Sequence, residues 1–140
     1  TEEIILKKSL DAIKNKDTNK YEKIKSCYEI VRARGKATII SLSKYFNALG
    51  IDYKVMHDSD EGNPVAANLN HFISEAVGSD ENVIMLNTCV EEVLGYPAPS
   101  GDKPYKAYEK CLEWEDDWSK IPDNWKNILK SLFSPIIDDF

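Results

Sequence analysis

Histidine and cysteine are scarce in this sequence. Its 140 residues include two histidines and three cysteines. No two cysteines stand at the Cys-x-x-Cys spacing that structural zinc sites use. The odd cysteine number and the shortage of histidine argue against both a disulfide framework and a zinc site. We therefore expect reduced thiols in a cytoplasmic protein.

Long apolar runs are also missing. No segment approaches the ~20 apolar residues that a membrane-spanning helix needs, and no secretory signal peptide is visible. There is also no Gly-x-x-x-x-Gly-Lys-Ser/Thr loop of the kind that cradles nucleotide phosphates. The composition, 42% hydrophobic and 30% charged, is that of one globular domain. We expect no membrane partner.

Charge is present in both signs but is unevenly distributed. Residues 1–56 carry 12 Lys and Arg against 7 Asp and Glu, a net charge of +5, while residues 57–140 carry 6 against 17, a net charge of −11. An acidic cluster beside a basic surface suits a metal site that handles phosphate groups. Chance segregation of solvated charges is the alternative.

Hydrophobic spacing and turn residues predict an alternation of helices and strands. The predicted helices are residues 2–16, 37–49, 65–77, 90–94, 104–114 and 123–133. The predicted strands are residues 24–32, 51–57 and 82–86, with a polar loop at 17–23. Such an alternation is typical of βαβ units, so the sequence predicts an α/β fold with a parallel sheet.

Asp58 and Asp60 follow the apolar segment 51–57 directly. In parallel sheets, ligand sites lie at the carboxyl ends of strands. Carboxylate oxygens at positions i and i+2 of a turn can converge on one hard cation such as Mg²⁺. A solvated turn, in which Asp serves as an ordinary turn residue, is the alternative.

Other polar and aromatic residues have simpler interpretations. Glu2 and Glu3 begin a helix, where acids complement the helix dipole. His57 is interpreted as a packing or hydrogen-bonding residue, with an acid–base role as the alternative. The three tryptophans lie among acidic residues that would repel a nucleic-acid backbone, so we expect them to serve in packing. They are Trp114, Trp118 and Trp125.

Several strings resemble one known family. These are TEEIIL at the start, the GK pair at 35–36, ALGIDYKVMHDSD around Asp58, VEEVLG at 90–95 and SGDKPYKAYEK at 100–110. Together they resemble the Toprim nuclease domain of the OLD (overcoming lysogenization defect) family over about residues 1–112. The resemblance implies a Rossmann-like Toprim fold. We expect a Toprim catalytic domain at 1–112 and a helical C-terminal extension at 113–140.

The resemblance also implies roles for individual residues. Asp58 and Asp60 would be metal ligands, and Glu2 would bind a second metal. Glu91 is a further ligand candidate, although Glu92 could serve equally. Two lysines complete the set: Lys103 would stabilise charge on the phosphate in the transition state, and Lys36 would position the loop or contact the DNA backbone.

The function implied by the resemblance is hydrolysis of phosphodiester bonds in DNA by a nuclease that uses two Mg²⁺ or Mn²⁺ ions. A role in anti-phage defence would be consistent with this family. The alternative is a Toprim domain that serves as a non-catalytic binding or assembly module. A third interpretation, a phosphatase-like domain with Asp58 as nucleophile, predicts a trapped aspartyl-phosphate.

One part of the family pattern is missing. The first glutamate of the family's Glu-Gly motif, and the strand that carries it, would fall before Thr1. We therefore expect the native protein to extend N-terminally, with an ATPase domain upstream and homo-oligomerisation through that domain. The fragment could be inactive without the missing strand and glutamate.

Overall fold

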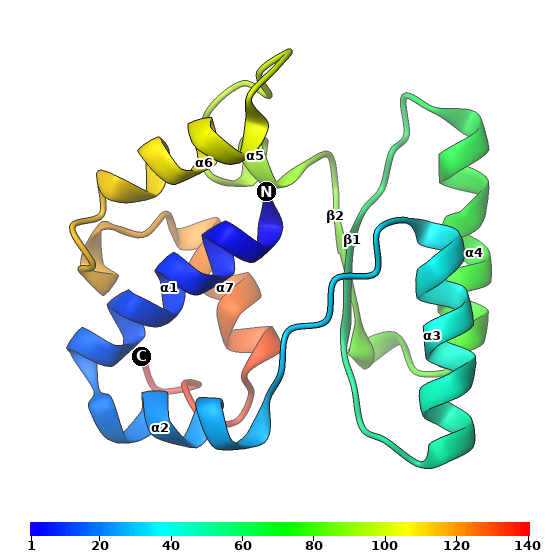
Figure 1. Ribbon diagram of the computed structural model, residues 1–140, viewed down its shortest axis with the longest axis horizontal. Coiled ribbons are helices and arrows are strands. Elements are labelled where there is room, and N and C mark those ends of the chain that lie inside the picture. The colour runs from blue at the N-terminus through cyan, green and yellow to red at the C-terminus, as the bar shows by residue number, and fades with distance from the viewer. The chain divides into compact units, whose positions relative to one another are not determined.

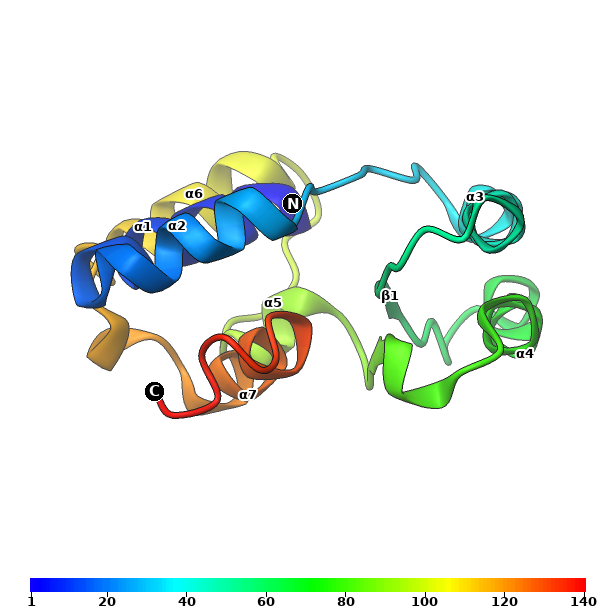
Figure 2. The same ribbon diagram turned by 90° about the horizontal axis from the view of Figure 1, so that it is seen from below.

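The computed structural model describes residues 1–140 as two compact units, and each is described here by itself. Unit 1 comprises residues 1–30 and 91–140, and unit 2 comprises residues 31–90. The ribbon is drawn in Figure 1 and, turned by 90°, in Figure 2. No helix in either unit is both long and apolar enough to cross a lipid bilayer. The predicted division of the chain at residue 112 stays a prediction.

Unit 1 is helical. Its elements are α1 (Glu2–Lys16), α2 (Thr18–Cys27), α6 (Lys103–Leu112), the short 3₁₀ turn η2 (Trp118–Lys120) and α7 (Asp123–Leu132), and α5 (Val90–Val93) stands at its boundary. Helices α1, α2 and α6 form one layer, with α7 beneath them in the view of Figure 2. The predicted helices 2–16, 104–114 and 123–133 are confirmed to within two residues.

The core of unit 1 is built from the apolar faces of these helices. Ile5, Ile13 and Leu129 are fully buried. Trp125 of α7 is also fully buried, and its indole N–H donates to Ser9 Oγ of α1 at 2.8 Å. A buried indole needs such a partner, because an unpaired N–H away from water costs free energy. The predicted packing role of the tryptophans is confirmed, since none is more than 7% exposed.

The predicted strand at 24–32 is wrong, as is the predicted loop at 17–23. The chain instead forms α2, because Asp17 Oδ1 accepts the backbone N–H of Lys20 at 3.0 Å and so caps the helix. Ile24 then lies on the inner face of α2, only 1% exposed. The β-branched and aromatic residues that suggested a strand lie largely after the helix, in the extended segment from Tyr28 onward.

Unit 2 is the α/β part of the chain. Its elements are α3 (Lys36–Leu49), β1 (Val55–Asp58), α4 (Pro64–Val77), the 3₁₀ turn η1 (Asp80–Asn82) and β2 (Val83–Leu86). The two strands pair in parallel, with Val55 opposite Val83 and Asp58 opposite Leu86. The predicted parallel α/β arrangement and the helices 37–49 and 65–77 are confirmed.

Helices α3 and α4 pack together on one side of the sheet (Figure 1). Val55 of β1 joins Ile73 and Val77 of α4 in the core, against which Ile39 of α3 also packs. Gly50 ends α3 in the left-handed conformation, with φ of 67°, which a residue without Cβ adopts at little cost. From Gly50 the chain runs into β1, whose carboxyl end carries the predicted carboxylates.

Candidate metal and nucleic-acid site

The segment Asp58–Ser59–Asp60 begins with the last residue of β1. Strand side chains alternate between faces, so Val55 and His57 share the face covered by α3 and α4. Asp58 lies on the opposite face. Ser59 continues the ladder, since its N–H donates to the carbonyl oxygen of Leu86 at 2.8 Å. The chain turns at Asp60, where φ is 55° and the carbonyl accepts the N–H of Asn63 at 2.8 Å.

Ser59 is the buried residue of this loop, with an exposed fraction of 1%. Its hydroxyl donates to the carbonyl oxygen of Asn87. Its own carbonyl oxygen accepts from Asn70 Nδ2 of α4 at 2.7 Å and from Lys36 Nζ of α3 at 3.3 Å. Hydrogen bonds to α3, to α4 and to the carboxyl end of β2 therefore hold the residue between the two carboxylates.

Lys36 brings a positive charge against this loop. Its ammonium lies 2.8 Å from Asp60 Oδ2, and its side chain is only 9% exposed. The ammonium also donates to Asn70 Oδ1 at 2.6 Å. A second carbonyl, that of Ala66, accepts at 3.3 Å. Lys36 is thus engaged inside unit 2, and its two predicted roles, loop positioning and contact with a DNA backbone, stay predictions.

Gly35 allows the chain to turn directly before Lys36. It precedes α3 with φ of 135°, a backbone conformation that side-chain-bearing residues rarely adopt. This turn makes Lys36 the first residue of α3. The GK pair singled out in the sequence therefore consists of a glycine that permits the turn and a lysine that contacts the carboxylate loop.

His57 is buried beneath the same loop, at 7% exposure. Its Nδ1 lies 2.8 Å from the carbonyl oxygen of Asp58. A carbonyl only accepts, so Nδ1 carries the proton and Nε2 is a buried acceptor without a hydrogen-bond partner. Burial lowers the pKa of His57 and outweighs the hydrogen bond to Asp58, which raises it; the charges of Lys36 and Asp60 act in opposite directions. The imidazole is therefore neutral near pH 7.

This lowered pKa predicts a pH dependence of stability. Below pH 6.5 the unfolded chain gains a proton on His57 that the folded chain resists, so the free energy of unfolding should fall as the pH is lowered from about 6.5 towards the folded pKa. Urea denaturation at pH 7.5 and 5.5 would measure this loss. We expect His57→Gln to reduce the loss.

His71 provides the matched control, because it is the second of the two histidines and its side chain is 80% exposed. The variant His71→Gln should keep the wild-type pH dependence. Equal pH dependence in the wild type and in His57→Gln would show that His57 does not carry the effect.

The remaining candidates lie in unit 1. Glu2 begins α1, with its carboxylate 3.6 Å from the amino group of Thr1. Glu91 of α5 is 3% exposed, whereas Glu92 is exposed. Lys103 begins α6 and is exposed. No hydrogen bond or ion pair joins Glu2, Glu91 and Lys103 to one another, and their predicted roles stay predictions.

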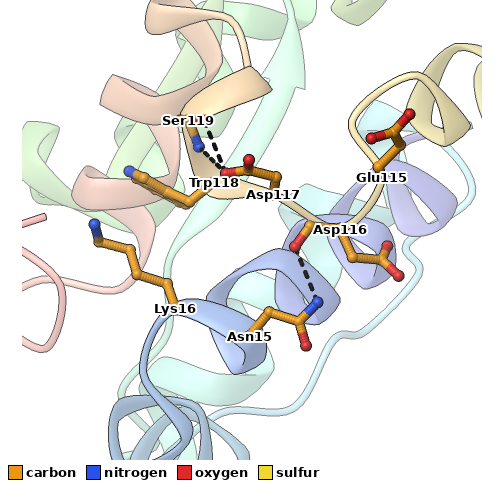
Figure 3. A pocket seen from close by; sticks show the side chains of 7 residues that line it. All are labelled: Asn15, Lys16, Glu115, Asp116, Asp117, Trp118 and Ser119. Carbon is orange, nitrogen blue, oxygen red and sulfur yellow. Dashed lines mark hydrogen bonds between the residues drawn. The ribbon is translucent and has the colours of Figure 1, made fainter.

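Neither unit assembles three or more His, Cys, Asp or Glu side chains into a group that could hold a metal ion. A pocket of about 350 Å³ is in unit 1 between the end of α1 and residues 115–119 (Figure 3). Residues that line this pocket form hydrogen bonds with one another: Ser119 donates to Asp117, and Asn15 donates to the backbone carbonyl of Asp116. This pocket contains none of the predicted site residues.

Sequence reasoning missed Asn70, which bridges Lys36 and Ser59 with its two amide atoms. One indication was available. Asparagine is a poor helix former, yet it stands in the middle of the helix predicted at 65–77. A polar side chain in that position often has a tertiary partner.

Comparison with known families gives one match. Residues 1–60 match the sequence model of the family described as "Overcoming lysogenization defect protein-like, TOPRIM domain". No curated protein matches the chain. No solved structure matches it either. The matched segment includes Glu2, Lys36, Asp58 and Asp60 but ends before Glu91 and Lys103.

The match supports a Toprim-type α/β module, and modules of this type belong to nucleic-acid-processing proteins and generally bind divalent metal ions. Residues 1–60, fewer than half of the 140 residues, are similar to the OLD-like Toprim domain. The predicted resemblance to this family is confirmed for residues 1–60, and the predicted α/β fold class is confirmed. The resemblance of residues 61–112 to the same family stays a prediction.

Proposed function

We propose that this chain is the catalytic part of a divalent-metal-dependent DNA endonuclease of the OLD family. The observation that carries the proposal is the placement of Asp58 and Asp60 at the end of a parallel strand. The two aspartates lie on either side of Ser59, which is buried and hydrogen-bonded through its N–H, its hydroxyl and its carbonyl group. Both aspartates lie inside the segment that matches the OLD-like Toprim family. The placement suits two oxygen ligands held by a rigid framework.

The residues around this loop fit a hard cation. Asp58 and Asp60 supply carboxylate oxygens, the donors that Mg²⁺ and Mn²⁺ prefer over zinc-type ligands. Four oxygen atoms at 2.6 to 3.3 Å surround the ammonium of Lys36, so this charge is already compensated inside unit 2. Water and substrate phosphates commonly complete the shell of such ions.

Each candidate residue has a proposed role. Asp58 and Asp60 would hold one cation, and Glu2 with Glu91 or Glu92 would hold a second. Bound cations would supply Lewis-acid activation of water and stabilisation of the leaving oxygen. Lys103 would place its ammonium beside the phosphate, where negative charge develops during in-line displacement. Lys36 would keep the Asp60 carboxylate in place.

The proposal predicts metal-dependent nicking of DNA. Supercoiled plasmid incubated with the chain should be converted to nicked or linear forms in Mg²⁺ or Mn²⁺, and the conversion should stop when EDTA removes the ion. Agarose gel electrophoresis measures the products. Ca²⁺ is a useful comparison, because it takes more ligands at longer distances and demands a less regular geometry than Mg²⁺.

A non-catalytic Toprim module is the second candidate function. The observation that favours it is that neither unit brings three acidic or His/Cys side chains together as a ready metal group. Such a module would bind DNA without cleaving it in Mg²⁺ or Mn²⁺. A gel-shift assay beside the nicking assay separates the two functions: binding without cleavage favours the module, and cleavage favours the nuclease.

The same proposal extends to the other domains, the assembly and the biological role of the protein. We propose that an ATPase domain upstream and homo-oligomerisation through it complete the protein, and that anti-phage defence is its setting. What supports these proposals is the match of residues 1–60 to the OLD-like family.

A further inference from the structure

We propose that Lys36 and Asn70 form a clamp that fixes the carboxylate loop of residues 58–60 before any metal ion binds. Both are positioning residues, and neither is proposed to touch a metal ion or DNA. The clamp itself is a claim about unit 2 alone. Its effect on metal binding rests on the function proposed above.

In the clamp, hydrogen bonds connect Lys36, Asn70 and the carbonyl group of Ser59 in a closed ring. Lys36 Nζ donates to Asn70 Oδ1 at 2.6 Å, and Asn70 Nδ2 donates to the Ser59 carbonyl at 2.7 Å. The same Ser59 carbonyl accepts from Lys36 Nζ at 3.3 Å. Lys36 then reaches Asp60 Oδ2 at 2.8 Å. Two helices thereby hold both the backbone and one carboxylate of the loop.

The position of Lys36 in α3 supports a tertiary role. A cation in the first turn of a helix faces the positive end of the helix dipole, which is the unfavourable end for it. Burying an ammonium also costs free energy unless the ammonium is paired and hydrogen-bonded. Four oxygen acceptors around Lys36 compensate both costs. A solvated lysine at this position would show none of them.

The clamp has a consequence that simple electrostatics does not predict. Removal of a positive charge 2.8 Å from Asp60 should, by charge alone, strengthen the binding of a cation to the loop. If Lys36 positions the loop, its removal frees the ligands to move, and they must then be ordered at the moment of binding. The positioning role therefore predicts weaker cation binding, and the two expectations have opposite signs.

The first test measures Mn²⁺ binding to the chain by isothermal titration calorimetry. Lys36→Met keeps the length of the side chain but removes its charge and donors, and we expect it to weaken Mn²⁺ binding by about 10-fold, as loss of an outer-sphere partner commonly does. Lys44→Met is the matched control: it makes the same change on an exposed residue of α3 and should leave affinity unchanged.

The second test measures amide hydrogen exchange without metal. The Ser59 N–H is bonded to Leu86 and the Asn63 N–H to Asp60. Both should exchange at least about 10-fold faster in Lys36→Met than in the wild type, and Lys44→Met should not change them. If Lys36→Met does not fold, Asn70→Ala removes the bridge between Lys36 and Ser59 and should accelerate the same two amides.

The outcomes separate this proposal from the proposed function. Absence of Mn²⁺ binding in the wild type contradicts the proposed function, and the exchange rates still decide whether the clamp exists. Unchanged exchange in the variants overturns the clamp, whatever the Mn²⁺ affinity. Faster exchange together with equal or tighter Mn²⁺ binding overturns the positioning of metal ligands by Lys36.

Discussion

Asp58→Ala should abolish metal-dependent DNA nicking, with a loss of roughly 100-fold or more, comparable to the removal of one key electrostatic group from an active site. The substitution removes one carboxylate from the end of β1. Because Asp58 lies on the face of the sheet opposite the Val55, Ile73 and Val77 core, the fold of unit 2 should survive. Plasmid nicking in Mg²⁺ or Mn²⁺ measures the loss, and circular dichroism verifies the fold.

Asp52→Ala is the matched control for this experiment. Asp52 is an exposed aspartate shortly before β1, and its removal makes the same change in charge away from the strand end. Nicking should continue at the wild-type rate in this variant. Undiminished nicking in Asp58→Ala would contradict the metal-ligand assignment, and parallel losses in both variants would point to overall charge instead.

Trp125→Ala should be the most destabilising single change in unit 1. The side chain is fully buried in α7, and its truncation leaves a cavity, which in protein cores costs about 3–5 kcal/mol for a Trp or Phe. The change also deprives the Ser9 hydroxyl of the indole donor. Urea denaturation followed by circular dichroism would measure the decrease in the free energy of unfolding.

Two further variants show which part of this loss of stability comes from the buried apolar volume of Trp125. Trp125→Phe keeps most of the apolar volume but loses the indole N–H, so it should cost clearly less than Trp125→Ala. Tyr108→Ala truncates an aromatic side chain on α6 that is 43% exposed, and surface changes of this kind usually alter stability by about 0.5 kcal/mol or less. Equal costs for Trp125→Ala and Tyr108→Ala would contradict the central place of Trp125 in the core.

Most elements of the fold could be predicted because their determinants are local. The apolar spacing of residues 65–77 and the glycine at position 50 are visible in the sequence, and both match the structure. The region around α2 was predicted wrongly because two indications competed. A cluster of Tyr, Ile and Val residues favours a strand, but the Asp17 cap acts earlier in the chain and starts a helix.

The candidate site could be predicted only in part. The position of Asp58 at the end of a parallel strand followed from the order of the elements alone. The contacts of Lys36 could not be predicted in this way, because Asp60 and Asn70 lie 24 and 34 positions away in sequence. Only the packing of α3 against α4 brings these side chains together.

The discontinuity of unit 1 limits how this chain can be divided. Its two segments, residues 1–30 and 91–140, are interrupted by the whole of unit 2. A fragment cut at residue 60, where the family match ends, would contain α1 without α6 and β1 without β2. Both partial units would expose apolar surface that the intact chain covers. Residues 31–90 form the one contiguous stretch that retains a complete unit, so an excised fragment for biophysical work should follow those boundaries.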